Sequence, residues 1–144
     1  MAMSKLTKAN RASRELVTEI LDRVLWWDTL KVIVQFLDAK NVQQVRVEYG
    51  FVLDRDLKKQ SQGQDQIIQL VDLESFIQRG LDEGTIEWGG GSDFLFHALG
   101  VELGFMLCND ADLHFASADS SLLLELGHRI TSGGIKVYDS GRLI

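Results

Sequence analysis

Apolar residues near the N-terminus recur with the spacing of an amphipathic helix. They occupy i, i+3 and i+4 positions from residue 16 to residue 24, and again from residue 30 to residue 37. The chain contains no proline, and no glycine precedes Gly50, so the usual helix breakers are missing from this region. We therefore predict N-terminal helices: either two helices, the second capped by Asp28, or one long bent helix.

The pattern then changes to the period of a strand. Residues 45–53 alternate between apolar and polar side chains, which is typical of a strand with one buried face. Residues 66–70 form a second short run that we interpret as a strand. The residues between them, 54–65, are polar apart from Leu57 and predict a mobile loop. Together these segments predict a hairpin with a long connection.

The remaining residues alternate between two helices and several short strands. Asp72 can cap a helix that ends at Gly84, and a second helix begins at Ser117 or Asp119. The expected strands are residues 85–88, 94–97, 101–108 and 113–116, followed by a terminal hairpin of residues 135–138 and 142–144. Short turns between strands favour antiparallel pairing.

These elements predict one α+β domain that spans residues 1–144. We expect N-terminal helices followed by a mainly antiparallel sheet of about five to seven strands, with two further helices packed on it. Residues 1–9 are expected to be frayed. A length of 144 residues is close to the commonest size for a single domain.

The composition indicates the cellular compartment in which we expect the protein. The chain has one cysteine, Cys108, which cannot form an internal disulfide and which we expect in or near the core. The N-terminal residues are polar and basic, unlike a signal peptide, and no apolar run is long enough to cross a bilayer. We therefore expect a cytoplasmic protein that does not act on a membrane.

The net charge of −6 is unevenly distributed along the chain. Residues 1–71 hold 11 Lys/Arg against 9 Asp/Glu, whereas residues 72–144 hold 4 against 12, and no Lys or Arg occurs from residue 80 to residue 128. Such a field repels a nucleic-acid backbone and attracts basic surfaces, although acidic residues also serve solubility. We expect no nucleic-acid partner.

The motifs of common catalytic and cofactor sites are missing. The glycine run at residues 89–91 follows a predicted strand, but no Lys-Ser/Thr pair follows it as in a phosphate-binding loop. We therefore expect no cofactor, no resident metal and no catalytic residue. One alternative is a small enzyme or a ligand-binding or metal-binding domain that uses His97, His114 and Asp112. Asp112 and His114 are two residues apart, which places them on one face of a strand.

A second alternative is a self-associating structural module. Trp26 and Trp27 diverge by about 100° on a helix, so we expect one in the core and the other partly exposed. An exposed tryptophan is either an interface hot spot or a ring folded over the helix end. The segment from residue 16 to residue 37 has apolar residues on more than one side, which favours a homodimer through the N-terminal helices.

The leading hypothesis draws on a resemblance in the C-terminal half. Residues 105–115 (FMLCNDADLHF) form two predicted strands around an acidic turn, and a helix and the strand GIKVY at 134–138 follow. This layout resembles small bacterial immunity proteins, which neutralise partner toxins. The resemblance implies a protein without enzyme activity that binds a toxin, often a basic one, through an acidic face. The carboxylates that we expect to bind such a partner are Glu87, Asp93, Glu102, Asp110 and Asp112.

Overall fold

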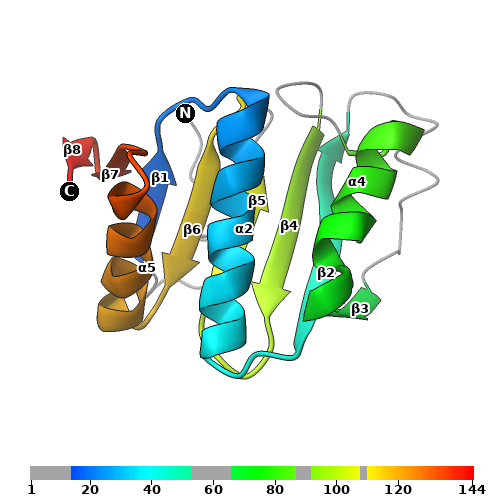
Figure 1. The fold of residues 1–144 in the computed structure, drawn as a ribbon, viewed down its shortest axis with the longest axis horizontal. Helices are drawn as coiled ribbons and strands as arrows, with labels where there is room; N and C mark the ends of the chain where they lie inside the picture. The colour runs from blue at the N-terminus through cyan, green and yellow to red at the C-terminus, as the bar shows by residue number, and fades with distance from the viewer. Residues whose placement is uncertain (1–13, 53–65, 87–91, 108–109) are drawn as a thin grey trace.

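The computed structural model describes residues 14–52, 66–86, 92–107 and 110–144. Within these ranges the chain is α+β, as predicted (Figure 1). The strands are β1 (Arg14–Thr18), β2 (Gln44–Val52), β3 (Gln66–Gln69), β4 (Ser92–Ala98), β5 (Gly104–Leu107), β6 (Leu113–Ser117), β7 (Val137–Asp139) and β8 (Arg142–Leu143). The helices are α2 (Arg23–Ala39), α4 (Leu73–Glu83) and α5 (Ser120–Ser132), and a 3-10 turn, η1 (Leu70–Asp72), precedes α4. The predictions for residues 1–9 and 54–65, and those for Glu87 and Cys108, lie outside the described residues.

The described strands form one antiparallel sheet in the order β3-β2-β4-β5-β6-β1-β7-β8. The predicted hairpin of β2 and β3 is confirmed, with Val45 opposite Ile68. Strands β4, β5 and β6 follow one another as neighbours, as short turns favour. The sheet has eight strands, more than the expected number of about five to seven, partly because β1 belongs to it.

The helix predicted from residue 16 is wrong. Residues 14–18 instead form β1, which pairs with β6 on one side and β7 on the other. Leu16 and Thr18 face the core, and the Thr18 hydroxyl accepts a hydrogen bond from the Leu113 N–H (N···O 3.0 Å). Pairing on both sides satisfies the backbone of this short segment, and that outweighs its helix-like spacing.

In the described residues a single N-terminal helix, α2, follows β1, so neither the two predicted helices nor one long bent helix from residue 16 is present. It begins at Arg23 because the Asp22 carboxylate accepts a hydrogen bond from the Leu25 N–H (Oδ1···N 2.9 Å). Asp28, the predicted cap, lies exposed inside the helix. The apolar residues before Arg23 therefore lie in β1 and in the connection from β1 to α2.

All three described helices cover the same face of the sheet (Figure 1). Phe94, Phe96, Phe105 and Phe115 project from the central strands into the core, and the rings of Phe96 and Phe105 stack with centroids 4.6 Å apart. On the opposite face, alternate residues of the same strands form a separate small cluster. That cluster consists of Leu95, Met106 and Ala116.

The later elements agree with the predictions in most places, but Asp72 precedes α4 without a side-chain cap bond, and the strand expected from residue 101 begins at Gly104. Helix α4 ends at Gly84, whose φ of 79° is left-handed, and Asp119 caps α5 by accepting a bond from the Leu122 N–H (3.1 Å). Residues 85 and 86 are not a strand, because their N–H groups bind the Gly80 carbonyl at the end of α4. In the described chain no helix combines the length and apolar character needed to cross a membrane.

Candidate functional site

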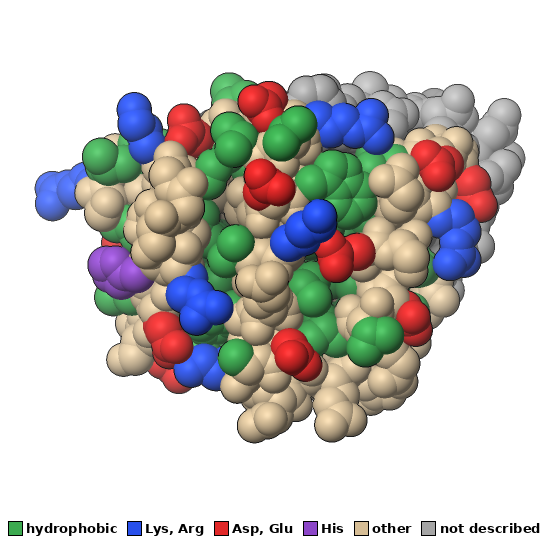
Figure 2. Space-filling model, viewed as in Figure 1, with side chains coloured by type: hydrophobic (Ala, Val, Ile, Leu, Met, Phe, Trp, Pro, Cys, Tyr) green, Lys and Arg blue, Asp and Glu red, His purple; other side chains and the backbone are tan. Residues whose placement is uncertain are grey.

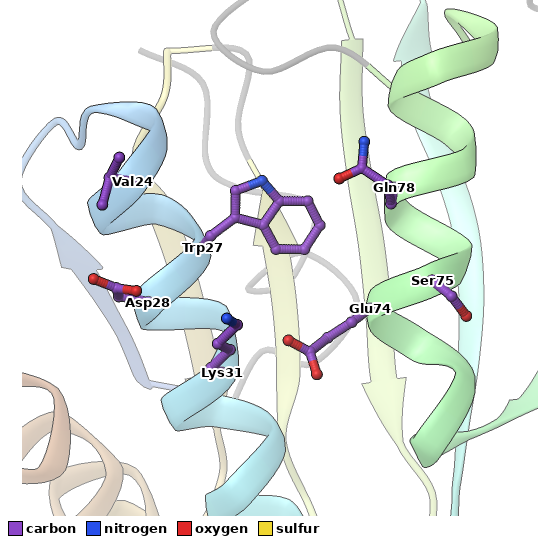
Figure 3. A pocket seen from close by; sticks show the side chains of 7 residues that line it. All are labelled: Val24, Trp27, Asp28, Lys31, Glu74, Ser75 and Gln78. Carbon is purple, nitrogen blue, oxygen red and sulfur yellow. The ribbon is translucent and has the colours of Figure 1, made fainter.

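The helical repeat separates the two adjacent tryptophans of α2. Trp26 is 2% exposed and belongs to the core, whereas Trp27 is half-buried, packs partly against the core and lies on the side of the helix that faces α4 (Figure 3). The two rings meet edge to face with centroids 5.1 Å apart. Val24 and Lys31 lie about one turn before and after Trp27 and share its face. Trp26 is therefore wholly a core residue, whereas Trp27 contributes to the packing and keeps part of its ring at the surface.

Trp27 lies in an open groove of about 540 Å³ between α2 and α4 (Figure 3). The lining residues of this α2–α4 groove are Val24, Trp27, Asp28 and Lys31 of α2 and Glu74, Ser75 and Gln78 of α4. Figure 3 shows the indole ring reaching from α2 toward α4, with Glu74 and Gln78 on the facing helix. An apolar ring surrounded by polar side chains is the arrangement found in protein interfaces.

The charged residues of the groove suit a basic ligand group. Asp28 and Glu74 contribute two carboxylates and Lys31 one ammonium, so the groove residues carry a net negative charge. A guanidinium entering the groove can stack on the Trp27 ring and donate hydrogen bonds to a carboxylate. The groove therefore combines an apolar anchor with acceptors for an arginine or lysine side chain.

Exposed apolar residues continue the groove past the N-terminal end of α2. Ile20 is 74% exposed, Val24 69% and Leu25 38%, and we refer to these three residues as the apolar end of α2. The Leu21 N–H donates to the Ala111 carbonyl (N···O 3.0 Å), which holds this connection against the turn between β5 and β6. Figure 2 shows hydrophobic side chains along α2 and at this end, with acidic side chains among them. Because Val24 belongs to both, the groove and the apolar end form one surface.

Of the five carboxylates predicted to bind a partner, the structure describes the side chains of Glu102, Asp110 and Asp112, and these three do not gather on one surface. Asp110 is exposed in the turn between β5 and β6, at the end of the sheet where β4 begins with residues 92 and 93. Glu102 is exposed in the connection from β4 to β5, at the opposite end. The side chain of Asp93 and all of Glu87 lie outside what the structure describes. Asp110 therefore lies near the apolar end of α2, and Glu102 does not.

Asp112 and His114 contact each other, as their spacing predicts. The Nε2 atom of His114 lies 3.1 Å from Asp112 Oδ1, and its Nδ1 atom lies 3.4 Å from Glu15 Oε2 on the neighbouring strand β1. The His114 side chain is only 6% exposed. The two carboxylates approach opposite ring nitrogens, so the three groups do not converge on a common ligand. This arrangement joins β6 to β1 on the face of the sheet that carries no described helix.

His97 has a separate carboxylate partner. Its Nε2 atom lies 3.4 Å from Glu48 Oε1 on β2. His97 pairs with Gly104 of β5, whereas His114 pairs with Met106 of the same strand, so β5 separates the two histidines. No three His, Cys, Asp or Glu side chains in the described ranges are placed to hold a metal ion. The histidines thus share one face of the sheet without forming one site.

The α2–α4 groove was missed in the sequence because it is built by two helices far apart in the chain. The signal within α2 was the spacing of Val24, Trp27, Asp28 and Lys31, which is one helical face of mixed character. Nothing in that segment identifies α4 as its neighbour. The sequence of the helix can therefore predict a partly exposed Trp27, but it cannot predict the groove in which Trp27 lies.

Comparison of the chain with protein-family models, with curated proteins and with solved structures finds no match.

Proposed function

We propose that this chain is a non-catalytic protein-binding domain that recognises a basic partner through the α2–α4 groove and the apolar end of α2. The observation that carries the proposal is the half-buried Trp27 in an open groove that continues into exposed Val24. Tryptophan is enriched among interface hot spots, and contiguous exposed apolar side chains mark interaction surfaces.

The apolar residues supply the free energy of binding. Full burial of one Val, Ile or Leu side chain contributes about 1.5–3 kcal/mol. Ile20 and Val24 offer the most apolar surface for a partner to bury at this end of the molecule, because most of each residue is exposed. Partial burial of these residues would add to the free energy of binding that the tryptophan anchor contributes.

The carboxylates select the partner and its orientation. Asp28 and Glu74 lie beside the apolar anchor, and Asp110 lies near the apolar end of α2. The chain as a whole carries a net charge of −6. Complementary charge speeds association and disfavours acidic competitors. A partner with arginine or lysine around an apolar centre fits this surface.

The concrete form of the proposal is an immunity-type inhibitor of a basic toxin. It follows from the resemblance of residues 105–115 and 134–138 to small immunity proteins, and the acidity of the chain supports it. The test is co-expression with the product of the adjacent gene, followed by co-purification and measurement of the dissociation constant. We expect a stable complex.

The role of the groove is tested in the same complex with Trp27→Ala. Truncation of an anchor tryptophan costs about 2 kcal/mol or more, which is about a 30-fold increase in the dissociation constant. Val71→Ala is the matched control, since Val71 is 86% exposed and lies outside the groove lining. Equal affinities of Trp27→Ala and the native chain, or the absence of any complex, would contradict the proposal.

A further inference from the structure

Strand β3 ends the sheet on one side, and no described strand pairs with its outer edge. On the inner side the Leu70 N–H donates to the Gln43 carbonyl (N···O 2.8 Å). Successive residues of a strand direct their backbone groups to opposite sides. The N–H and C=O groups of Ile67 and Gln69 therefore point away from β2, where a further strand can bind them.

The edge is bordered by a second groove, of about 580 Å³, between β3 and α4. Its lining residues are Gln66, Ile67, Ile68 and Gln69 of β3, Asp72 of η1, and Ser75, Phe76 and Arg79 of α4. Ile67 is 57% exposed, and the strand sequence Gln-Ile-Ile-Gln contains neither charge nor proline. Short length, charge, proline and bulges are usual means by which edge strands avoid pairing. Strand β3 is short, with four residues, but its sequence carries no charge or proline, so its outer edge can accept another strand.

We propose that β3 pairs antiparallel with β3 of a second copy of this chain, about a two-fold axis that passes beside Ile68. In this register Ile67 pairs with Gln69 of the partner subunit, and Gln69 pairs with Ile67 of the partner subunit. The outward backbone groups then form about four hydrogen bonds. The two eight-stranded sheets become one continuous sheet, with the helices of both copies on the same face.

The charges beside the groove are self-complementary under this symmetry. Asp72 lies at the start of α4 and Arg79 lies seven residues later on the same face, about 10 Å along the helix. A strand of four residues spans about 13 Å, so the two charges flank its length. The two-fold axis therefore brings Asp72 toward Arg79 of the partner subunit, and Arg79 toward Asp72 of the partner subunit.

This complementarity favours a second copy over an unrelated strand. Within the described chain neither Asp72 nor Arg79 forms an ion pair. In a two-fold symmetric contact each of the two charges meets its opposite on the other copy. An unrelated strand need not carry a matching charge for either. The contact is short, which places it at the small end of specific interfaces, so we expect a dimer that dissociates on dilution. It does not use Trp27 or the other α2 residues of the α2–α4 groove, although Ser75 lines both grooves, and it does not depend on the function proposed above.

The backbone contact is tested by sedimentation velocity of the full chain from low to high micromolar concentration. We expect a concentration-dependent monomer–dimer equilibrium that Ile67→Pro abolishes. The Ile67 N–H points outward, so proline there removes a donor at the edge without breaking the pairing of β3 with β2. Ile67→Thr retains the N–H and is the matched control, which we expect to dimerise.

The charge contact is tested by exchanging the two charges. Asp72→Lys and Arg79→Asp are each expected to be monomeric when alone, because each places like charges opposite one another. Mixing the two variants is expected to produce a heterodimer, and the double variant is expected to dimerise with itself. A variant that had lost its fold could not regain dimer formation on mixing or in the double variant. This pattern therefore distinguishes a broken charge contact from a loss of folding.

A native chain that is monomeric at every concentration overturns the proposal. A dimer that survives both Ile67→Pro and Arg79→Asp also overturns it, since the contact would then lie elsewhere. Loss of the dimer on substitution of Val24, with retention in Ile67→Pro, would instead assign self-association to α2 and equally overturn pairing through β3.

Discussion

The start of α2 gives a direct test of the fold, because the sequence pattern and the structure place the helix cap at different aspartates. In the structure the Asp22 carboxylate accepts the Leu25 N–H at 2.9 Å, and Asp28 is exposed within the helix. We expect Asp22→Ala to destabilise the protein and Asp28→Ala to leave its stability nearly unchanged.

The magnitude follows from the two interactions that Asp22 provides. Loss of a side-chain cap costs about 1 kcal/mol, and loss of a negative charge at a helix N-terminus costs about 0.3–1 kcal/mol more. We therefore expect a decrease of about 1–2 kcal/mol in the free energy of unfolding, or about 4 °C in Tm per kcal/mol for a chain of this size. Asp28→Ala removes no cap and substitutes a better helix former.

The assay is urea unfolding followed by far-UV circular dichroism, with Asp22→Asn as a second control. Asparagine caps as well as aspartate, so this variant should lose only the smaller contribution of the charge. An unchanged m-value would show that the same surface unfolds in each variant. A loss of stability in Asp28→Ala equal to that in Asp22→Ala would refute the assigned start of α2.

Two further predictions concern the packing of the sheet and α4. Gly80→Ala places a methyl group 2.4 Å from Ile86 Cδ1, and we expect thermal unfolding to reveal a loss of about 1–3 kcal/mol; native-like stability would contradict this packing. His114→Ala leaves two carboxylates facing an empty space, and we expect a loss of about 1–3 kcal/mol, larger than that of His97→Ala, whose pair is more exposed. Equal losses in urea unfolding would count against a buried role for His114.

Local sequence signals predicted an element correctly where nearby residues determine its pattern or its ends. Alternation over residues 45–53 predicted β2, and Gly84 predicted the left-handed end of α4. Asp119 was one of the two predicted starts of α5, and it caps that helix. In each case the determining residues lie within a few positions of the element that they define.

Signals failed where the outcome depends on distant residues. The five residues of β1 share the spacing of a helix turn, and their state is decided by β6 and β7, which lie about a hundred residues later. Ile20 and Val24 continue the same helical spacing, yet both are exposed. A pattern of this length cannot distinguish a core-facing helix from a strand followed by an exposed connection.

The candidate site was only partly predictable for the same reason. The divergence of Trp26 and Trp27 follows from helical geometry and is confirmed by their burial. The sequence shows that residues 80–128 are acidic. Which of these acidic residues lie at which end of the sheet depends on the direction of the strands. Glu102 and Asp110 are close in sequence and lie at opposite ends because β5 runs between them.

The binding surface is tested most directly by a nuclear magnetic resonance titration of the isotope-labelled chain with the purified product of the adjacent gene. We expect the Trp27 indole N–H and the backbone amides of Val24, Glu74 and Gln78 to shift or broaden together as the complex forms. Shifts confined to the opposite face of the sheet, around His97 and Met106, would contradict binding through the α2–α4 groove.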